Sequence, residues 1–136
     1  MPINLEIVSP ERLLLSRPVD MAVIPASEGE MGVLEGHAPM IVLLRGGTIA
    51  LHEGGRVTER LFVAGGFAEI TGQRVTVLAD EARPVGELDR AEAERRLADA
   101  EAALKGISAF DVPAQDAALD RVQSARAMLA AATGPS

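Results

Sequence analysis

Glycine and alanine are distributed very unevenly along this chain, and their division limits what the chain can fold into. Eleven of the 13 glycines lie in residues 29–86, whereas 15 alanines lie in the 50 residues from Glu87 onward. Short segments punctuated by glycine are typical of β-strands joined by tight turns, and alanine-rich periodic segments are typical of helices. We therefore expect a β domain over residues 1–85 and a helical part over residues 86–136.

The β domain is expected to contain about nine short strands, a number and spacing typical of a sandwich or a flattened barrel. The expected strands are residues 3–7, 13–16, 19–24, 31–34, 40–44, 48–52, 57–63, 67–70 and 74–79. Pro18 and Pro25 are expected to interrupt or end strands, because proline donates no ladder hydrogen bond. The apolar run at residues 40–44 is expected to be a buried strand, and residues 82–87 are expected to form a linker. The prediction is an all-β domain of two packed sheets.

Two helices are expected in the C-terminal part, joined by a connector at residues 107–115 that contains Pro113. Each helix has a narrow apolar seam at helical spacing. The seam of residues 88–105 consists of Ala93, Leu97, Ala100 and Leu104, and that of residues 116–132 consists of Ala118, Val122, Ala125 and Leu129. Matched seams predict an antiparallel two-helix hairpin. Alanine seams bury little area, so the hairpin should be only marginally stable alone, which favours a second conformation on another partner.

Residues 27–39, with the sequence SEGEMGVLEGHAP, predict an exposed double loop on the β domain. Glycine supplies backbone freedom in each of its two turns. Glu28 and Glu30 are expected to be a solvated turn or a docking edge, with an acid/base pair as the alternative. His37 is expected to bond the neighbouring backbone, with a proton-transfer role as the alternative. Exposed loops on a rigid scaffold carry contacts, so this loop is a candidate binding surface.

Charge and composition exclude several classes of protein. The formal net charge is −7 and only 2% of the residues are aromatic, which disfavours partners such as nucleic acid or anionic membranes. No apolar run approaches the roughly 20 residues that cross a bilayer. The N-terminus shows no signal-peptide pattern and the chain has no cysteine. We expect a soluble cytoplasmic protein without disulfides or thiolate metal sites.

No catalytic motif is visible in the sequence. It contains no GxSxG elbow, no phosphate-binding loop and no HExxH motif. Counting alone does not exclude a site built on the two histidines, His37 and His52, but nothing in the sequence brings their partners together. We therefore expect a protein that is not an enzyme, with neither a metal nor a cofactor.

Charged residues alternate in sign along the first expected helix, which is typical of a solvated face with pairs such as Glu92–Arg96. The alternative is an anion-binding site that uses Arg95 and Arg96. Paired arginines are common on helices without a ligand, so the solvated face is the preferred interpretation.

Three ordered motifs resemble one family. They are SEGEMGVLEGHAP at residues 27–39, FVAGGFAEI at 62–70 and VTVLAD at 75–80. Together with the helical hairpin, they are similar to the epsilon subunit of bacterial F-type ATP synthase, called delta in mitochondria. The resemblance implies an α+β protein: an N-terminal sandwich of about ten strands followed by an antiparallel two-helix hairpin. It covers essentially the whole chain.

The resemblance also implies a mechanical role without catalysis. A subunit of this family rotates with the central stalk and couples proton translocation to ATP synthesis, with its sandwich on the gamma subunit and a loop end on the ring of c subunits. The ring contact is implied at Glu28, Gly29, Glu30 and His37. The family often has proline where this chain has Glu35. A peripheral place on the cytoplasmic face of the bacterial inner membrane, held by the complex, is implied as well.

In many bacterial relatives the hairpin acts as a regulatory domain, makes transient contact with alpha and beta subunits and inhibits ATP hydrolysis through basic residues. In those relatives the basic residues face an acidic loop of the beta subunit. Here residues 111–132 carry three aspartates and two arginines, so a negatively charged segment would face that acidic loop, and strong inhibition is disfavoured.

Some relatives bind ATP through a Leu/Ile-Asp-x-x-Arg-Ala pattern. The corresponding run begins at Leu88 and Asp89 but has Glu92 in place of arginine, which should weaken phosphate binding. Asp89, Arg95 and Arg96 remain the candidate ATP residues, and we expect weak or no ATP binding. The alternatives are a nucleotide-sensitive brake on hydrolysis and, from another class, a small β-sandwich ligand-binding module.

Overall fold

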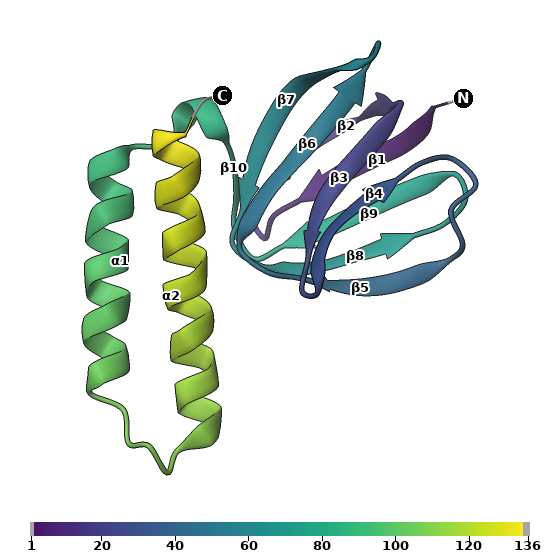
Figure 1. The fold of residues 1–136 in the computed structure, drawn as a ribbon. Helices are drawn as coiled ribbons and strands as arrows, with labels where there is room; N and C mark the ends of the chain where they lie inside the picture. The colour runs from purple at the N-terminus through teal and green to yellow at the C-terminus, as the bar shows by residue number, and fades with distance from the viewer. Residues whose placement is uncertain (1, 135–136) are drawn as a thin grey trace.

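The computed structural model describes residues 2–134, and within them ten strands precede a helical hairpin (Figure 1). The strands are β1 (Ile3–Val8), β2 (Leu13–Val19), β3 (Met21–Ala26), β4 (Gly29–Val33), β5 (Met40–Leu44), β6 (Gly47–Glu53), β7 (Arg56–Val63), β8 (Gly66–Ile70), β9 (Arg74–Ala79) and β10 (Ala82–Pro84). They are followed by a short 3-10 helix, η1 (Val85–Glu87), and by α1 (Arg90–Lys105) and α2 (Val112–Thr133). The predicted fold class is confirmed.

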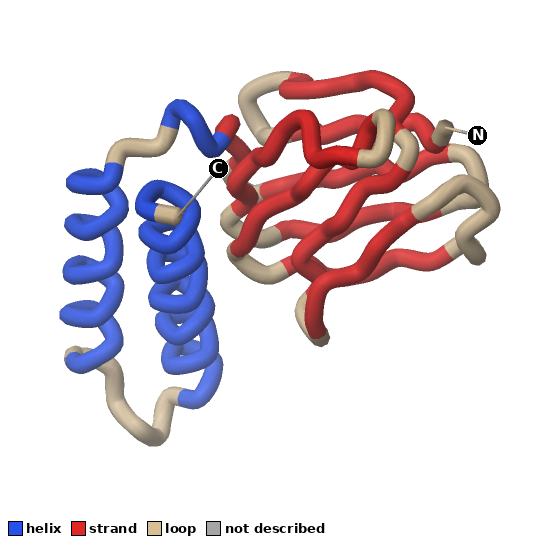
Figure 2. Tube along the Cα trace, turned by 45° about the horizontal axis from the view of Figure 1, so that its top comes forward, coloured by secondary structure: helices blue, strands red, loops and turns tan. Residues whose placement is uncertain are grey.

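The strands form two layers around one core (Figure 2). One layer has the order β10-β7-β6-β3-β4 and the other the order β5-β8-β9-β1-β2. Every paired set is antiparallel except β1 with β9. The layers share backbone pairing only where Ala26 lies opposite Leu44, which makes the whole sandwich one continuous hydrogen-bonded path.

Side chains close the opposite end of this path. Arg17 of β2 donates to Glu53 at 2.8 Å and lies 3.1 Å from Glu59. These two acids come from β6 and β7, so the ion pairs connect the last strand of one layer to the other layer. The sandwich therefore approaches a closed barrel.

The core follows the alternation that the sequence predicts. In β1, Ile3, Leu5 and Ile7 are fully buried while Asn4 is exposed. Fully burying such a side chain contributes about 1.5–3 kcal/mol. Among residues 2–134 no polar or charged residue is fully buried, so the sandwich rests on apolar packing.

The hairpin forms as its seams predict. Asp89 caps α1 by accepting a hydrogen bond from the Ala91 N–H, and Asp111 caps α2 in the same way through Ala114. The expected seam residues Ala93, Ala100, Ala118, Val122 and Ala125 are buried, and Leu97 and Leu104 pack against them. On the last turns of α2, Met128 is buried where Leu129 was expected, and Leu129 is only partly covered.

Two prolines do not end strands as predicted. Pro18 lies inside β2, the outermost strand of its layer, where a missing N–H on the free edge costs no ladder bond. Pro25 lies inside β3, beyond Val23, the last β3 residue that pairs with β6. Its carbonyl still accepts a bond from the Arg45 N–H at 3.0 Å. Both prolines are tolerated inside a strand because no neighbouring strand needs a hydrogen bond donated from their positions.

Two connectors are more ordered than predicted. Residues 82–87 form β10 and η1 and are no free linker, because Ala82 and Pro84 pair with Val63 and Leu61 of β7. Pro113 does not lie in a connector but in the first turn of α2, where a helix has no use for the missing N–H.

Candidate functional site

The hairpin is fastened to the sandwich through turns between strands. The side-chain amide of Gln123 on α2 accepts a bond from the Gly46 N–H at 2.9 Å and donates to the Gly46 carbonyl at 2.7 Å. The hydroxyl of Ser124 donates to the Ala64 carbonyl at 3.0 Å. A Cβ on residue 46 would lie 2.5 Å from the Ser124 Cα, so only glycine allows α2 to come this close. We call the paired Gln123–Gly46 bonds the clasp.

An aromatic side chain packs between the sandwich and the hairpin near the clasp. Phe62 points outward from β7 and is 1% exposed, because Ala93 of α1 and Met128 of α2 cover it. Val85 and Leu88 pack against the same cluster. The outer face of β7 is therefore apolar only where the hairpin lies on it.

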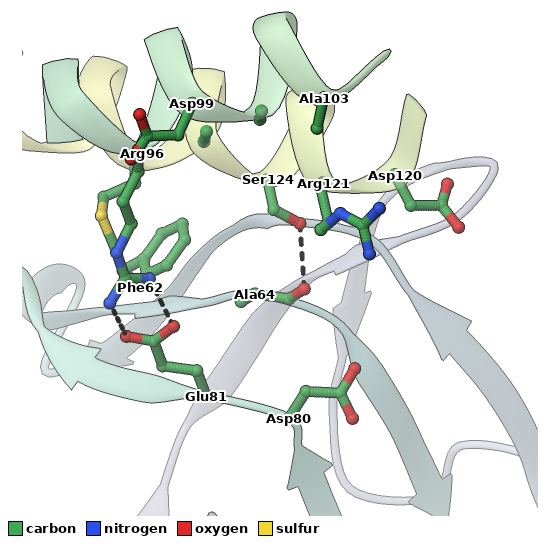
Figure 3. Close-up of a pocket in the computed structure, with 13 residues that line it drawn as sticks. Phe62, Ala64, Asp80, Glu81, Arg96, Asp99, Ala103, Asp120, Arg121 and Ser124 are labelled. Atoms are coloured by element: carbon green, nitrogen blue, oxygen red, sulfur yellow. Dashed lines mark hydrogen bonds and ion pairs between the residues drawn. The ribbon is translucent and has the colours of Figure 1, made fainter. Parts of the chain in front are cut away.

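Four charged side chains form a network beside this cluster (Figure 3 shows its Arg96–Glu81 part). Arg96 of α1 forms two parallel bonds to Glu81, at 2.6 and 3.0 Å, and lies 3.3 Å from Glu92. Arg83 of β10 lies 3.1 Å from Glu92 and 3.2 Å from Glu81. Its hydrogen bond and charge hold the pKa of Glu92 below the ordinary value, with a smaller effect of Arg96. The expected Glu92–Arg96 pair is present within a network that also binds α1 to the sandwich.

An open pocket of about 520 Å³ lies between the hairpin and the sheet. Its floor includes Phe62 and Ala64, and Asp99, Asp120 and Arg121 lie around it (Figure 3). Charges of both signs surround an apolar floor, so the pocket has no pronounced preference for an anion.

The three candidate ATP residues are not gathered at this pocket. Asp89 is occupied as the cap of α1 and Arg96 by Glu81, while Arg95 is exposed on the helix. Only Arg96 of the three lines the pocket. Residues 2–134 also contain no cluster of three or more His, Asp or Glu side chains that could hold a metal ion.

The strand predicted between the two turns of the double loop is present as β4. Glu28 lies in the turn between β3 and β4, Gly29 and Glu30 begin β4, and His37 lies in the loop beyond its other end. Gly29 has a φ of 137°, which favours glycine. Because β4 has five residues and each step along a strand is about 3.3 Å, its first and last residues are about 13 Å apart. The four residues of the implied ring contact therefore form two separate groups.

His37 makes the backbone contact expected of a loop histidine. Its Nδ1 lies 2.8 Å from the Ala38 carbonyl, and a carbonyl only accepts, so Nδ1 carries the proton. The preceding Gly36 donates to the Gly72 carbonyl at 2.7 Å, which ties this loop to the turn between β8 and β9.

The outer face of the second layer carries an uncovered apolar row. In strand register, Leu43 lies opposite Phe67, Phe67 opposite Leu78, Leu78 opposite Val8, and Val8 opposite Leu13. The exposed fractions of Leu43 and Leu13 are 67% and 55%. We call these five residues the apolar row. An exposed apolar row of this kind is a candidate contact surface for another molecule.

The prediction that residues 40–44 form a buried strand is wrong in part. They form β5, but only Leu44 is buried, and Ile41 is 67% exposed. A run of consecutive apolar residues is typical of a strand covered on both faces. In the structure of the single chain, only the inner face of β5 is covered. The sequence signal for an apolar outer face was that no polar residue alternates with the apolar ones.

No helix within residues 2–134 is long and apolar enough to cross a membrane. The hairpin helices carry charged residues along their length, as the alternating pattern indicates.

Comparison with known proteins first defines the class. The chain matches the family model described as ATP synthase, Delta/Epsilon chain, beta-sandwich domain, over residues 2–85. This match covers more than half of the chain and corresponds to strands β1 to β10. The chain therefore belongs to the ATP synthase delta/epsilon chain family.

Individual relatives narrow the family. The chain is 67% identical over 129 residues to the ATP synthase epsilon chain of Granulibacter bethesdensis, covering 95% of this chain and 96% of the relative. It is 44% identical over 129 residues to the ATP synthase epsilon chain of Rhodospirillum rubrum, covering 95% of each. The resemblance to the epsilon subunit that the three motifs predict is confirmed.

A solved structure is similar along nearly the whole chain. A chain in the Euglena gracilis mitochondrial ATP synthase structure, which comprises OSCP, F1 and c-ring, superposes with a TM-score of 0.76 at 26% identity. The match covers 96% of this chain and 81% of that one.

Proposed function

We propose that this chain is a non-catalytic subunit of the central stalk of an F-type ATP synthase, which turns with the stalk and helps couple proton translocation to ATP synthesis. The observation that carries the proposal is its 67% identity to an ATP synthase epsilon chain over 95% of its length. The Euglena gracilis neighbour, whose structure contains F1 and a c-ring, supports the same kind of assembly.

The gamma subunit of the stalk is the partner proposed for the apolar row. The row crosses all five strands of its layer, and the hairpin packs against β6 and β7 of the other layer. Burying a fully exposed leucine contributes about 1.5–3 kcal/mol, and the leucines and the phenylalanine of the row are 38–67% exposed, so covering them together can sustain a lasting contact. Residues 1–85 are proposed to be the domain that makes it.

The c-subunit ring is the second proposed partner, through Glu28, Gly29 and Glu30, with His37 as the fourth residue. The two carboxylates are exposed on a tight turn, where they can meet polar or basic groups. Because His37 belongs to the separate loop beyond β4, we expect substitutions at Glu28 and Glu30 to act together and those at His37 to act independently.

Residues 86–136 are proposed to be a hairpin domain whose contact with alpha and beta subunits is transient at most. The docked arrangement is supported by the clasp and by the ion pairs of Arg96 and Arg83. In this proposal the chain lies at the cytoplasmic face of the bacterial inner membrane, where its partners hold it.

Co-purification with gamma tests the proposal. Tagged gamma, co-expressed with this chain, should retain the wild type and a Leu119→Glu control, whose side chain is 49% exposed on α2 outside the row. A Leu43→Glu/Leu78→Glu variant should be lost, because two carboxylates would be buried in an apolar contact. A wild-type chain with no affinity for gamma would refute the function, whereas full retention of the double variant would refute only the assignment of the row.

A further inference from the structure

The open side of the sandwich has a groove between two strand edges. Its volume is about 470 Å³, and it is lined by residues 26–31 on one side and residues 40–43 on the other. Within residues 2–134, β4 pairs only with β3, and β5 pairs with β8 along its length but with β3 only at Leu44. Both strands therefore leave a backbone edge without a neighbouring strand, and the two edges flank this groove.

The hydrogen-bond pattern shows which backbone groups of β5 are free. The Leu43 carbonyl accepts from the Ser27 N–H at 2.8 Å, so residue 43 directs its backbone groups away from β8. Backbone groups alternate along a strand, so those of Ile41 point the same way while those of Val42 pair with β8. Among residues 2–134, the N–H and C=O of Ile41 and the N–H of Leu43 have no partner outside the β8 ladder.

The edge of β5 lacks the features that normally protect an edge strand. Exposed edges are usually shielded by charged residues, proline, a bulge or a covering segment. β5 reads Met-Ile-Val-Leu-Leu, pairs with β8 without a register shift, and exposes 67% of both Ile41 and Leu43. An edge of this kind associates with another strand unless a partner occupies it.

The charge on the groove restricts what can occupy it. Glu28 and Glu30 line it, are exposed, and form no ion pair with any other residue in the described range 2–134. No basic residue lines the groove. A second copy of this chain would bring four carboxylates together, which opposes self-pairing through β5, whereas a basic segment would be attracted.

We propose that this groove accepts an extended, basic segment of another polypeptide in the assembled complex, which adds to the free edge of β5 as a further strand. Its backbone pairs with Ile41 and Leu43, its apolar side chains continue the sheet beside them, and its basic side chains face Glu28 and Glu30. The inference rests on the proposed function in that the partner is a chain of the assembled synthase.

Amide hydrogen exchange tests strand addition residue by residue. In the free chain, the amides of Ile41 and Leu43 should exchange rapidly and those of Val42 and Leu44 slowly. In the complete enzyme, the first two should slow at least tenfold. Unchanged exchange at both positions in an enzyme that retains the chain would overturn the inference without touching the proposed function, which fails only if the chain does not assemble.

Two variants provide independent checks. Ile41→Pro removes an N–H from the free edge but none from the β8 ladder, so the chain should fold, as judged by circular dichroism, and occupy the enzyme at least tenfold less than Ile41→Val. Should the proline variant not fold, Glu28→Lys/Glu30→Lys decides the matter through amide exchange, because loss of assembly alone would also follow from the ring contact proposed for these carboxylates. In the enzyme that retains this variant, the protection of Ile41 and Leu43 should fall at least tenfold against Glu87→Lys, an exposed control on η1. The inference is contradicted if the folded proline variant assembles as well as the wild type, or if Ile41 and Leu43 stay as protected in the lysine variant as in the wild type. It is also contradicted if amide protection of Ile41 and Leu43 in the free chain increases with the concentration of the chain, because this would indicate self-pairing.

Discussion

Gly46→Ala is the sharpest test of how the hairpin is held. The new Cβ would lie 2.5 Å from the Ser124 Cα and 2.7 Å from its Oγ, about 1 Å short of ordinary contact. The hydroxyl can rotate away, but the Ser124 Cα belongs to the backbone, so α2 must move away from the turn. The backbone of residue 46 has an ordinary φ, so the sandwich itself accepts alanine.

The size of the effect follows from the contacts that this shift disturbs. The clasp supplies two hydrogen bonds, at 2.9 and 2.7 Å, and Ser124 supplies a third at 3.0 Å. Each contributes about 0.5–1.5 kcal/mol net. Strain or loss of this set should weaken docking by about 2 kcal/mol, roughly a 30-fold change in the docking equilibrium.

Fluorescence energy transfer can measure the docked fraction, because the chain has no cysteine and two can be introduced cleanly. Ser16→Cys on β2 and Ala109→Cys in the hairpin loop are both exposed. Gly86→Ala is the matched control, since a Cβ there meets nothing within 4 Å. The reasoning is refuted if Gly46→Ala has the same docked fraction as Gly86→Ala.

Three further outcomes are expected. Phe62→Ala should lower the free energy of unfolding by about 3–5 kcal/mol in urea denaturation, because Phe62 is 1% exposed, whereas Phe67→Ala, 39% exposed, should cost far less; similar losses would contradict this. The pKa of Glu92 is lowered in the folded state from an ordinary 4.5, so its contribution is present above that pH and is lost as pH falls through the lower folded value. Docking of the hairpin, measured by energy transfer, should weaken on acidification below about pH 4.5, and it should weaken less in Glu92→Gln. An identical acid response in the wild type and this variant would count against the network. Calorimetry should detect no saturable ATP binding by the isolated chain at micromolar ATP, because Arg96 is held by Glu81; clear binding would overturn this.

Local patterns predicted the elements that depend on local physics. The alanine seams predicted the two helices, and the structure shows that Asp89 caps the first of them. The glycine-rich turns separated the strands, although Pro18 and Pro25 were assigned as strand ends, because a proline's effect depends on whether a neighbouring strand needs its N–H.

Contacts between distant segments were not predictable from the sequence. Gln123 and Gly46 are 77 residues apart, and neither carries a signal that it pairs with the other. The Arg96–Glu81 pair could not be predicted either, since the sequence suggested only ion-pair partners on the same helix. For the candidate site, the sequence predicted a strand between the turn of Glu30 and the turn of His37, and β4 is that strand, but no local signal showed how far apart it holds the two turns.

The clasp has a consequence for timing. The clasp and the Ser124–Ala64 bond engage backbone groups of Gly46 and Ala64, which lie in turns, so hairpin release breaks no strand ladder. Release should occur on the microsecond-to-millisecond scale of helix and domain motions, whereas opening of the continuous sheet should take seconds or longer. The hairpin can therefore sample other positions many times while the sandwich, which stays fully paired, keeps its hold on whatever it contacts.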